Sequence, residues 1–297
     1  MPVETCSTDE TWSYGLDLAG YSTGKSALAR AKGGANDSID VDVVLGHPFA
    51  KKVLGATSLQ HDDLKQELDA FVWILRQGRL FIDVPVDLQG LPNPANADYV
   101  WQLTQRAVDR MFGGLAPLAD RLGAPVARMA RLLARCQSAR LGQNVFETYP
   151  AQSLKNILAD GDGYKRQSCK WHGNGWSGGK LATLAQGLGL KGPKEVNFAL
   201  DDDEFDAIVC ALCGVVKDDH RLEGGQLCDE VAKYFSQPER AALPDWPAPK
   251  GYVVLRPSDD KSWPFKKIQV RKVTWPDFNP VAQTAVGDKS SHQPQEA

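Results

Sequence analysis

Residues 12–20 alternate between large apolar side chains and small or polar ones, which is the period-two pattern of a β-strand. One predicted face consists of large apolar residues: Trp12, Tyr14, Leu16 and Leu18. On the other face Asp17 lies between Gly15 and Ala19, so we expect open space in front of its carboxylate. A charge inside a strand is costly unless an internal salt bridge, hydrogen bonds or a metal ion offsets its desolvation.

Two further acids occupy the same position in short apolar segments. Residues 80–85 predict a strand with Asp83 near its end, and Pro85 ends the strand because proline cannot continue a central ladder. Residues 145–150 repeat the pattern with Glu147. Ligands of open α/β sheets bind at the carboxyl ends of the strands, so these acids indicate a site at one edge of a sheet.

The opening of the chain is predicted to contain three antiparallel strands. The first strand is followed by strands over 26–31 and 39–45, with a hairpin loop over 32–37 between them. Asp40 and Asp42 alternate with apolar residues in the third of these strands. We expect both carboxylates to face solvent.

Helical periodicity marks residues 62–77, where apolar residues recur at three- and four-residue steps and Gly78 ends the pattern. A helix that leads directly into the strand of Asp83 predicts parallel pairing of that strand with an earlier one. Two further helices are expected over 98–112 and 115–138. The second of them carries on one face three arginines that we expect to be solvated: Arg128, Arg131 and Arg135.

The segment 164–180 combines cations, aromatic rings and glycines. Cations interleaved with aromatic rings suit phosphate contact and base stacking, but a flexible surface lid has the same composition. Both interpretations stay open. The candidate substrate-binding residues are Lys165, Arg166, Lys170, Trp171 and Trp176.

Residues 200–206 place an acidic cluster at the start of the apolar run 207–216. Acids at the start of a helix are favoured by the helix dipole and by capping, so the cluster alone is weak evidence. Asp203 and Asp206 are three residues apart and therefore share one helical face. We expect that face to look towards the sheet edge where the three earlier acids lie.

Composition excludes several classes of protein. The chain has 297 residues, of which 42% are hydrophobic and 24% are charged, as in ordinary globular proteins. The formal net charge of −3 argues against a general polyanion-binding surface but allows a local basic patch. No apolar run approaches the roughly 20 residues of a membrane helix, and residues 1–10 lack a signal-peptide core. We therefore expect a cytoplasmic protein without membrane contact.

The 6 cysteines are scattered along the chain, which favours reduced thiols over a disulfide framework. The spacing of Cys169 and His172, together with that of Cys210 and Cys213, resembles the ligand spacing of a zinc site. However, Cys210 and Cys213 lie in an apolar helical run, where small buried thiols are common. Buried thiols are therefore the favoured interpretation.

Five short motifs resemble the domain of unknown function 429 family, whose members are regarded as predicted nucleases of the ribonuclease H-like superfamily. They occur in the expected order over residues 12–256. The motifs are Gly-Leu-Asp-Leu-Ala-Gly at 15–20, Ile-Asp-Val-Pro at 82–85, Phe-Glu-Thr-Tyr-Pro at 146–150, Asp-x-x-Asp-Ala-x-x-Cys-Ala-Leu at 203–212 and Gly-Tyr-Val-Val-Leu at 251–255.

The resemblance implies an α/β fold, with a mixed five-stranded sheet of order 3-2-1-4-5 and helices on both faces. It implies one ribonuclease H-like domain over 11–256, with helical and loop insertions. Residues 1–10 are then expected to be disordered, and 257–297 to form a partly disordered C-terminal extension.

The resemblance also implies a hydrolase site in which Asp17, Asp83, Glu147 and Asp206 are the catalytic, metal-binding carboxylates and Asp203 is an auxiliary ligand. Hard Mg²⁺ or Mn²⁺ prefers such oxygen ligands. Two ions about 3.5–4 Å apart, with Asp17 bridging them, would hydrolyse a phosphodiester bond of RNA or DNA. No histidine has an obvious place in this acidic set.

Two other functions stay open. The motif at 15–20 also resembles the first phosphate motif of the actin, sugar-kinase and Hsp70-type ATPases, which share the ribonuclease H-like fold. Those proteins normally repeat the fold and carry a glycine-rich adenosine motif late in the chain, and this sequence shows only Gly224-Gly225 there. The second alternative is a non-catalytic nucleic-acid-binding scaffold with a vestigial acidic cleft.

Overall fold

The computed structural model describes these segments of the chain: 11–33, 38–53, 62–86, 122–158, 160–194, 197–216, 220–223, 251–256 and 267–275. Three expectations fall wholly or mostly outside them, namely the disorder of residues 1–10, the helix over 98–112 and the extension over 257–297. No helix in the described segments combines the length and the apolar character that crossing a membrane requires.

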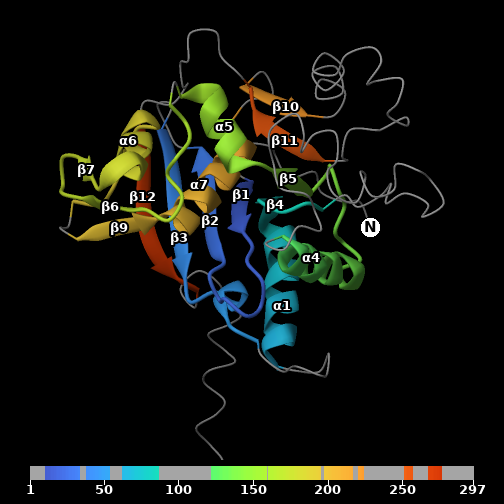
Figure 1. Ribbon diagram of the computed structural model, residues 1–297. Helices are drawn as coiled ribbons and strands as arrows, with labels where there is room; N and C mark the ends of the chain where they lie inside the picture. Colours follow the sequence, from blue (N-terminus) through green and yellow to red (C-terminus); the bar gives the residue numbers. More distant parts are fainter. Residues whose placement is uncertain are drawn as a thin grey trace, which may run out of the picture.

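β1 (Trp12–Asp17) lies in the middle of the main sheet (Figure 1). It pairs antiparallel with β2 (Ala27–Gly33) on one side and parallel with β4 (Gly78–Ile82) on the other. β3 (Ser38–Leu45) pairs antiparallel with β2, and β5 (Val145–Thr148) pairs parallel with β4. The three antiparallel strands at the opening of the chain are therefore present, and β4 runs parallel to β1 as expected.

Four further strands extend this sheet on both sides. β11 (Tyr252–Leu255) pairs parallel with β5, and β10 (Arg221–Glu223) pairs antiparallel with β11. On the other side β12 (Lys267–Thr274) pairs parallel with β3, and β8 (Leu190–Lys191) pairs parallel with β12. Within the described segments the sheet has nine strands in the order β10-β11-β5-β4-β1-β2-β3-β12-β8, not the five expected. It also extends past the expected domain boundary at 256.

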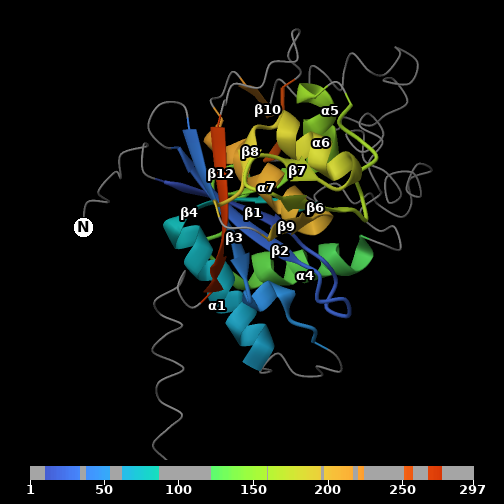
Figure 2. The same cartoon turned by 90° about the vertical axis from the view of Figure 1, so that its left-hand side faces the viewer.

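Helices cover both faces of the sheet. α7 (Asp202–Val215) packs across β1 and β2, with α5 (Pro150–Ile157) and α6 (Gly179–Gly187) on the same face. α1 (Asp62–Gln77) and α4 (Gly123–Arg135) cover the opposite face (Figure 2). The helix over 62–77 is thus confirmed. The fold is α/β, with a mixed central sheet between two helical layers.

The two faces of β1 pack differently because their side chains differ in size. Tyr14 belongs to the buried apolar cluster beneath α1 and α4. On the opposite face a Cβ atom at Gly15 would lie 2.0 Å from the backbone oxygen of Ala207 and 2.3 Å from the backbone nitrogen of Ala211. The Ser13 hydroxyl donates a hydrogen bond of 2.6 Å to the Ala211 carbonyl. The space expected along this face of the strand is therefore filled by α7.

Asp42 corrects another expectation. Asp40 is exposed as expected, but Asp42 is only 1% exposed. Its carboxylate pairs with Arg30 of β2 at 2.8 Å and with Arg271 of β12 at 2.6 Å. Because β2 and β12 flank β3 on both sides, this carboxylate lies within the sheet and is compensated by a cation from each neighbour.

A second, smaller sheet replaces the expected loop over 164–180. β6 (Ser168–Trp171) pairs antiparallel with β7 (Trp176–Ser177) and with β9 (Phe198–Asp201). β9 runs directly into α7. This small sheet therefore connects the segment before β6 to the acidic start of α7.

Candidate active site

Three of the predicted carboxylates converge at one edge of the main sheet. Asp17 ends β1, and Asp83 directly follows β4. Because these strands are parallel neighbours, their ends coincide, and the Asp83 backbone N–H donates a hydrogen bond of 3.0 Å to the Leu16 carbonyl. Asp206 comes from the start of α7, which the small side chains of β1 admit against the sheet. All three carboxylates interact electrostatically.

Burial and mutual repulsion disfavour the charged forms of these carboxylates. Burial, the larger cause, and then the charges of Asp83 and Asp206 raise the pKa of Asp17 well above its ordinary value. Burial and the charge of Asp206 likewise raise the pKa of Asp83 to about 7. The pKa of Asp206 is also raised, chiefly by burial. The cluster therefore has less positive charge beside it than its three carboxylates would need to ionise normally.

Lys165 supplies part of the missing positive charge. Its ammonium group forms an ion pair with one carboxylate oxygen of Asp206, and the Tyr164 hydroxyl donates a hydrogen bond of 2.6 Å to the other. The lysine charge also lowers the pKa of Asp17 and Asp83, against the effect of burial. Lys165 was expected to contact substrate. The structure pairs it with the acidic cluster but leaves its side chain 53% exposed, so the substrate contact stays a prediction. Both oxygens of Asp206 are engaged.

The remaining two predicted acids lie at the margins of the cluster. Glu147 is 3% exposed, and its carboxylate accepts a hydrogen bond of 3.0 Å from the backbone N–H of Val86, which fastens the segment that follows β4. Asp203 is half-buried, and burial followed by the charges of Asp202 and Asp201 raises its pKa to about 6. Glu147 therefore supports the backbone after β4, and its charge also contributes, after burial, to the raised pKa of Asp83, whereas the pKa of Asp203 is raised by burial and by its acidic neighbours at the start of α7.

The candidate substrate-binding residues of 164–180 separate into two groups. Trp171 and Trp176 are 7% and 8% exposed, and their indole N–H groups donate hydrogen bonds of 2.9 and 2.8 Å to the carbonyls of Pro193 and Leu190. These rings are packed in the core beneath the small sheet and present no stacking surface. Arg166 and Lys170 are exposed, as a substrate contact requires.

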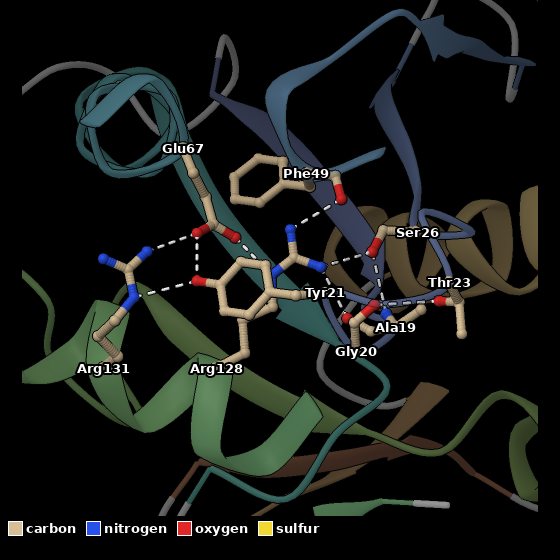
Figure 3. A network of polar contacts seen from close by, with 9 residues as sticks. All are labelled: Ala19, Gly20, Tyr21, Thr23, Ser26, Phe49, Glu67, Arg128 and Arg131. Carbon is tan, nitrogen blue, oxygen red and sulfur yellow. Dashed lines mark hydrogen bonds and ion pairs between the residues drawn. The ribbon is translucent and has the colours of Figure 1, made fainter. Parts of the chain in front are cut away.

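A buried polar network, which the sequence analysis missed, supports the loop that follows Asp17 (Figure 3). Arg128 of α4 is 2% exposed and donates a hydrogen bond of 2.5 Å to Glu67 of α1. Arg131 also pairs with the Glu67 carboxylate at 2.5 Å, and the Tyr21 hydroxyl donates a hydrogen bond of 2.6 Å to the same carboxylate. The prediction of a solvated arginine face is wrong for Arg128 and correct for Arg135, which is exposed.

The Arg128 guanidinium joins two loops to this network. It donates hydrogen bonds of 2.7 Å to the Ala19 carbonyl and 3.2 Å to the Ser26 hydroxyl. It also donates one of 2.8 Å to the carbonyl of Phe49, in the short 3₁₀ helix η1 (Pro48–Ala50) that follows β3. One buried side chain therefore holds both the loop after β1 and the loop after β3. The sequence signal was Glu67 itself, a charged residue within the apolar stripe of its helix.

Preformed metal coordination is not found in the described residues. None of their His, Cys, Asp and Glu side chains forms a group of three or more arranged to hold a metal ion. Cys169, Cys210 and Cys213 are buried free thiols, as the sequence favoured, and they do not assemble a zinc site with His172. Any metal-binding function of the acidic cluster is therefore a proposal.

No family model, no curated protein and no solved structure matches this chain. The resemblance to the domain of unknown function 429 family stays a prediction, and the site is interpreted from its own chemistry.

Proposed function

We propose that this protein is a divalent-metal-dependent nuclease that hydrolyses phosphodiester bonds. The observation that carries the proposal is the convergence of Asp17, Asp83 and Asp206 at one sheet edge, from segments far apart in the sequence. Such a concentration of negative charge is unfavourable without a cation, and strongly perturbed carboxylates are typical of functional sites.

The arrangement of strands supports the ribonuclease H-like part of the proposal. Within the nine-stranded sheet, the middle strands follow the order β3-β2-β1-β4-β5, with the first three antiparallel. This is the order that the family resemblance implies, and it brings the carboxylates of β1 and β4 side by side. The outer strands and the small sheet are then additions to that core.

The donor chemistry of the cluster fits a hard divalent cation such as Mg²⁺ or Mn²⁺. Asp17 and Asp83 are half-buried, and among the described residues no donor lies within hydrogen-bonding distance of either carboxylate. These two, with Asp203, are the available ligands, whereas Asp206 becomes available only when Lys165 releases it. A bound cation would polarise the scissile phosphate and lower the pKa of a bound water.

The protein's own residues have separate parts in this proposal. Asp17 and Asp83 would hold the cation, and the buried network around Arg128 keeps the loop beyond Asp17 in place. Glu147 orients the segment that follows Asp83 by accepting the Val86 N–H. Lys165 maintains the charge balance of the cluster when no cation is bound.

Replacement of Asp17 by Asn tests the proposal, because it preserves shape and removes one ligand charge. We expect Mn²⁺ to raise the melting temperature of the wild type, and Asp17→Asn to abolish that increase together with cleavage of labelled RNA and DNA. Asp69→Asn is the matched control, since Asp69 is an exposed acid of α1 on the other face of the sheet. It should behave as the wild type does.

A metal-induced increase that survives unaltered in Asp17→Asn would remove this residue from the site. A wild type that binds Mn²⁺ and a nucleic acid strand but cleaves nothing would favour the non-catalytic scaffold. Binding of ATP is measured beside binding of Mn²⁺ and of the strand. ATP binding without strand binding would favour the actin-like alternative.

A further inference from the structure

An open cleft of about 800 Å³ adjoins the acidic cluster. One wall is formed by the start of β2, the end of β3 and the loop that follows it. The other wall is formed by residues 166–168 and by the start of α7. Two features place the cleft beside the acids: Ala27 of the first wall pairs with Asp17 in the sheet, and Asp203 lines the second wall.

The first wall carries one exposed aliphatic side chain. Val43, Val44 and Leu45 line it; Val43 and Val44 are buried, whereas Leu45 is 40% exposed, which is unusual for a large apolar side chain in the described part of this chain. At Gly46 the backbone adopts a φ of 68°, and a Cβ atom there would meet nothing within 4 Å. A planar apolar group can therefore approach this wall closely.

The acids of the second wall are mostly engaged within the protein. Asp201 caps α7 by accepting the Glu204 backbone N–H at 2.8 Å, and Glu204 pairs with Lys272 at 2.5 Å. Asp202 accepts the backbone N–H of Arg166 at 2.7 Å. Only Asp203 has no such partner among the described residues, and it belongs to the acidic cluster.

Two cations in the cleft are not engaged. Lys25 and Arg166 line it, and neither side chain has a carboxylate within ion-pair distance in the described segments. Arg166 has a φ of 63°, in the left-handed region, where a non-glycine residue is strained. The hydrogen bond from its backbone N–H to the Asp202 carboxylate stabilises this conformation. On either side of this turn in the backbone, Lys165 pairs with the acidic cluster and Arg166 lines the cleft.

We propose that this cleft binds a nucleoside phosphate, either as a free mononucleotide or as one nucleotide of a strand. The base would lie against the aliphatic wall at Leu45, and the phosphate would contact Lys25 and Arg166. A volume of about 800 Å³ is in the range of sites for small organic ligands. The choice of phosphate as the anion rests on the proposed function. A nucleic acid strand bound in this cleft would extend to the acidic cluster, where the proposed cleavage takes place.

A binding experiment without metal tests this proposal separately from catalysis. A fluorescein-labelled single strand of about ten nucleotides is titrated with the protein in EDTA over a series of salt concentrations, and AMP is added as a competitor. We expect Lys25→Gln and Arg166→Gln each to weaken binding roughly tenfold, and each to reduce the logarithmic salt slope by about 0.7. Lys65→Gln is the control, since Lys65 is an exposed cation of α1 on the opposite face of the sheet.

Leu45→Ser tests the aliphatic wall, and its effect on folding is small because the side chain is already exposed. We expect weaker binding with an unchanged salt slope, since no phosphate contact is lost. Displacement of the strand by AMP assigns the site to free nucleotides as well, whereas binding of the strand alone assigns it to polymers.

Equal affinity of the wild type, Lys25→Gln and Arg166→Gln would overturn the proposal, and so would a wild type that binds neither probe. These results are independent of the Asp17→Asn experiment. Metal-dependent cleavage that is indifferent to Arg166→Gln leaves the proposed function intact and rejects the cleft. Strand binding through the cleft without any metal response rejects the nuclease and retains the cleft.

Discussion

At the scale of single residues, the acidic cluster is a source of instability that a ligand can relieve. The carboxyl of Asp83 has an ordinary pKa of 3.8 in the unfolded chain and about 7 in the fold, chiefly because it is buried. Below pH 3.8 it is protonated in both states, so it costs the fold nothing. As the pH rises towards 7, the unfolded chain ionises first and becomes favoured, and above pH 7 the cost is complete.

The variant Asp83→Asn should therefore be more stable than the wild type in EDTA at about pH 8, by at least 2 °C or so in melting temperature, roughly 1 kcal/mol. The difference should shrink as the pH falls towards about 4. Melting curves across this range, with Asp69→Asn as the control, check the prediction. A difference that is constant with pH would show that Asp83 titrates normally.

Lys165 gives a second prediction at this scale. Its ammonium group compensates the same carboxylates that we propose as metal ligands, so the lysine and a divalent cation compete for one role. Lys165→Gln should therefore raise the affinity for Mn²⁺ by roughly tenfold, since a repulsive charge is removed. Isothermal titration measures the change, with Lys65→Gln as the control. A loss of affinity would mean that Lys165 helps to form the site.

At the scale of elements, the site depends on how closely α7 approaches β1. Gly15 has no side chain between the strand and the helix, and Ser13 has only a small one, whose hydroxyl is hydrogen-bonded to α7. Gly214 of α7 is packed equally closely, since a Cβ atom there would lie 2.1 Å from the Ser13 hydroxyl oxygen. This close packing sets the position of Asp206 relative to Asp17. The position of the Asp206 carboxylate is thus determined by glycines that have no functional group of their own.

Gly15→Ala should destabilise the protein by about 3 kcal/mol or more, because the added methyl group overlaps the backbone of α7. Gly33→Ala is the matched control: Gly33 also lies in a strand, and a Cβ atom there meets nothing within 4 Å. Urea denaturation compares the two. If both variants had the stability of the wild type, the described packing of α7 on β1 would be incorrect.

Local patterns predicted the central elements because their chemistry is local. The alternation around Asp17, the apolar segment before Asp83 and the periodicity over 62–77 each describe one strand or helix, and each is present. The helix before β4 predicted that this strand would pair in parallel with an earlier one, and the order implied by the family resemblance placed it beside β1. The meeting of three carboxylates was therefore within reach of the sequence alone.

At the scale of the whole molecule, the predictions that failed depended on distant partners. The alternation around Asp42 predicted a solvated acid, but β12 lies beside β3 and covers this carboxylate. Its partner Arg271 lies 229 residues further along the chain. Trp171 and Trp176 were predicted to stack on bases, but their rings are buried and their indole N–H groups donate hydrogen bonds to the carbonyls of Pro193 and Leu190. No periodicity within a short window contains such information.

The place of β12 has a consequence for how the chain is made. β3 (Ser38–Leu45) is synthesised more than 200 residues before its neighbour β12 (Lys267–Thr274), with which it pairs in parallel. Until then one edge of β3 is open to wrong pairing, and Asp42 has only one of its two arginines. Pairing along this edge of β3 can therefore be completed only after β12 has been synthesised.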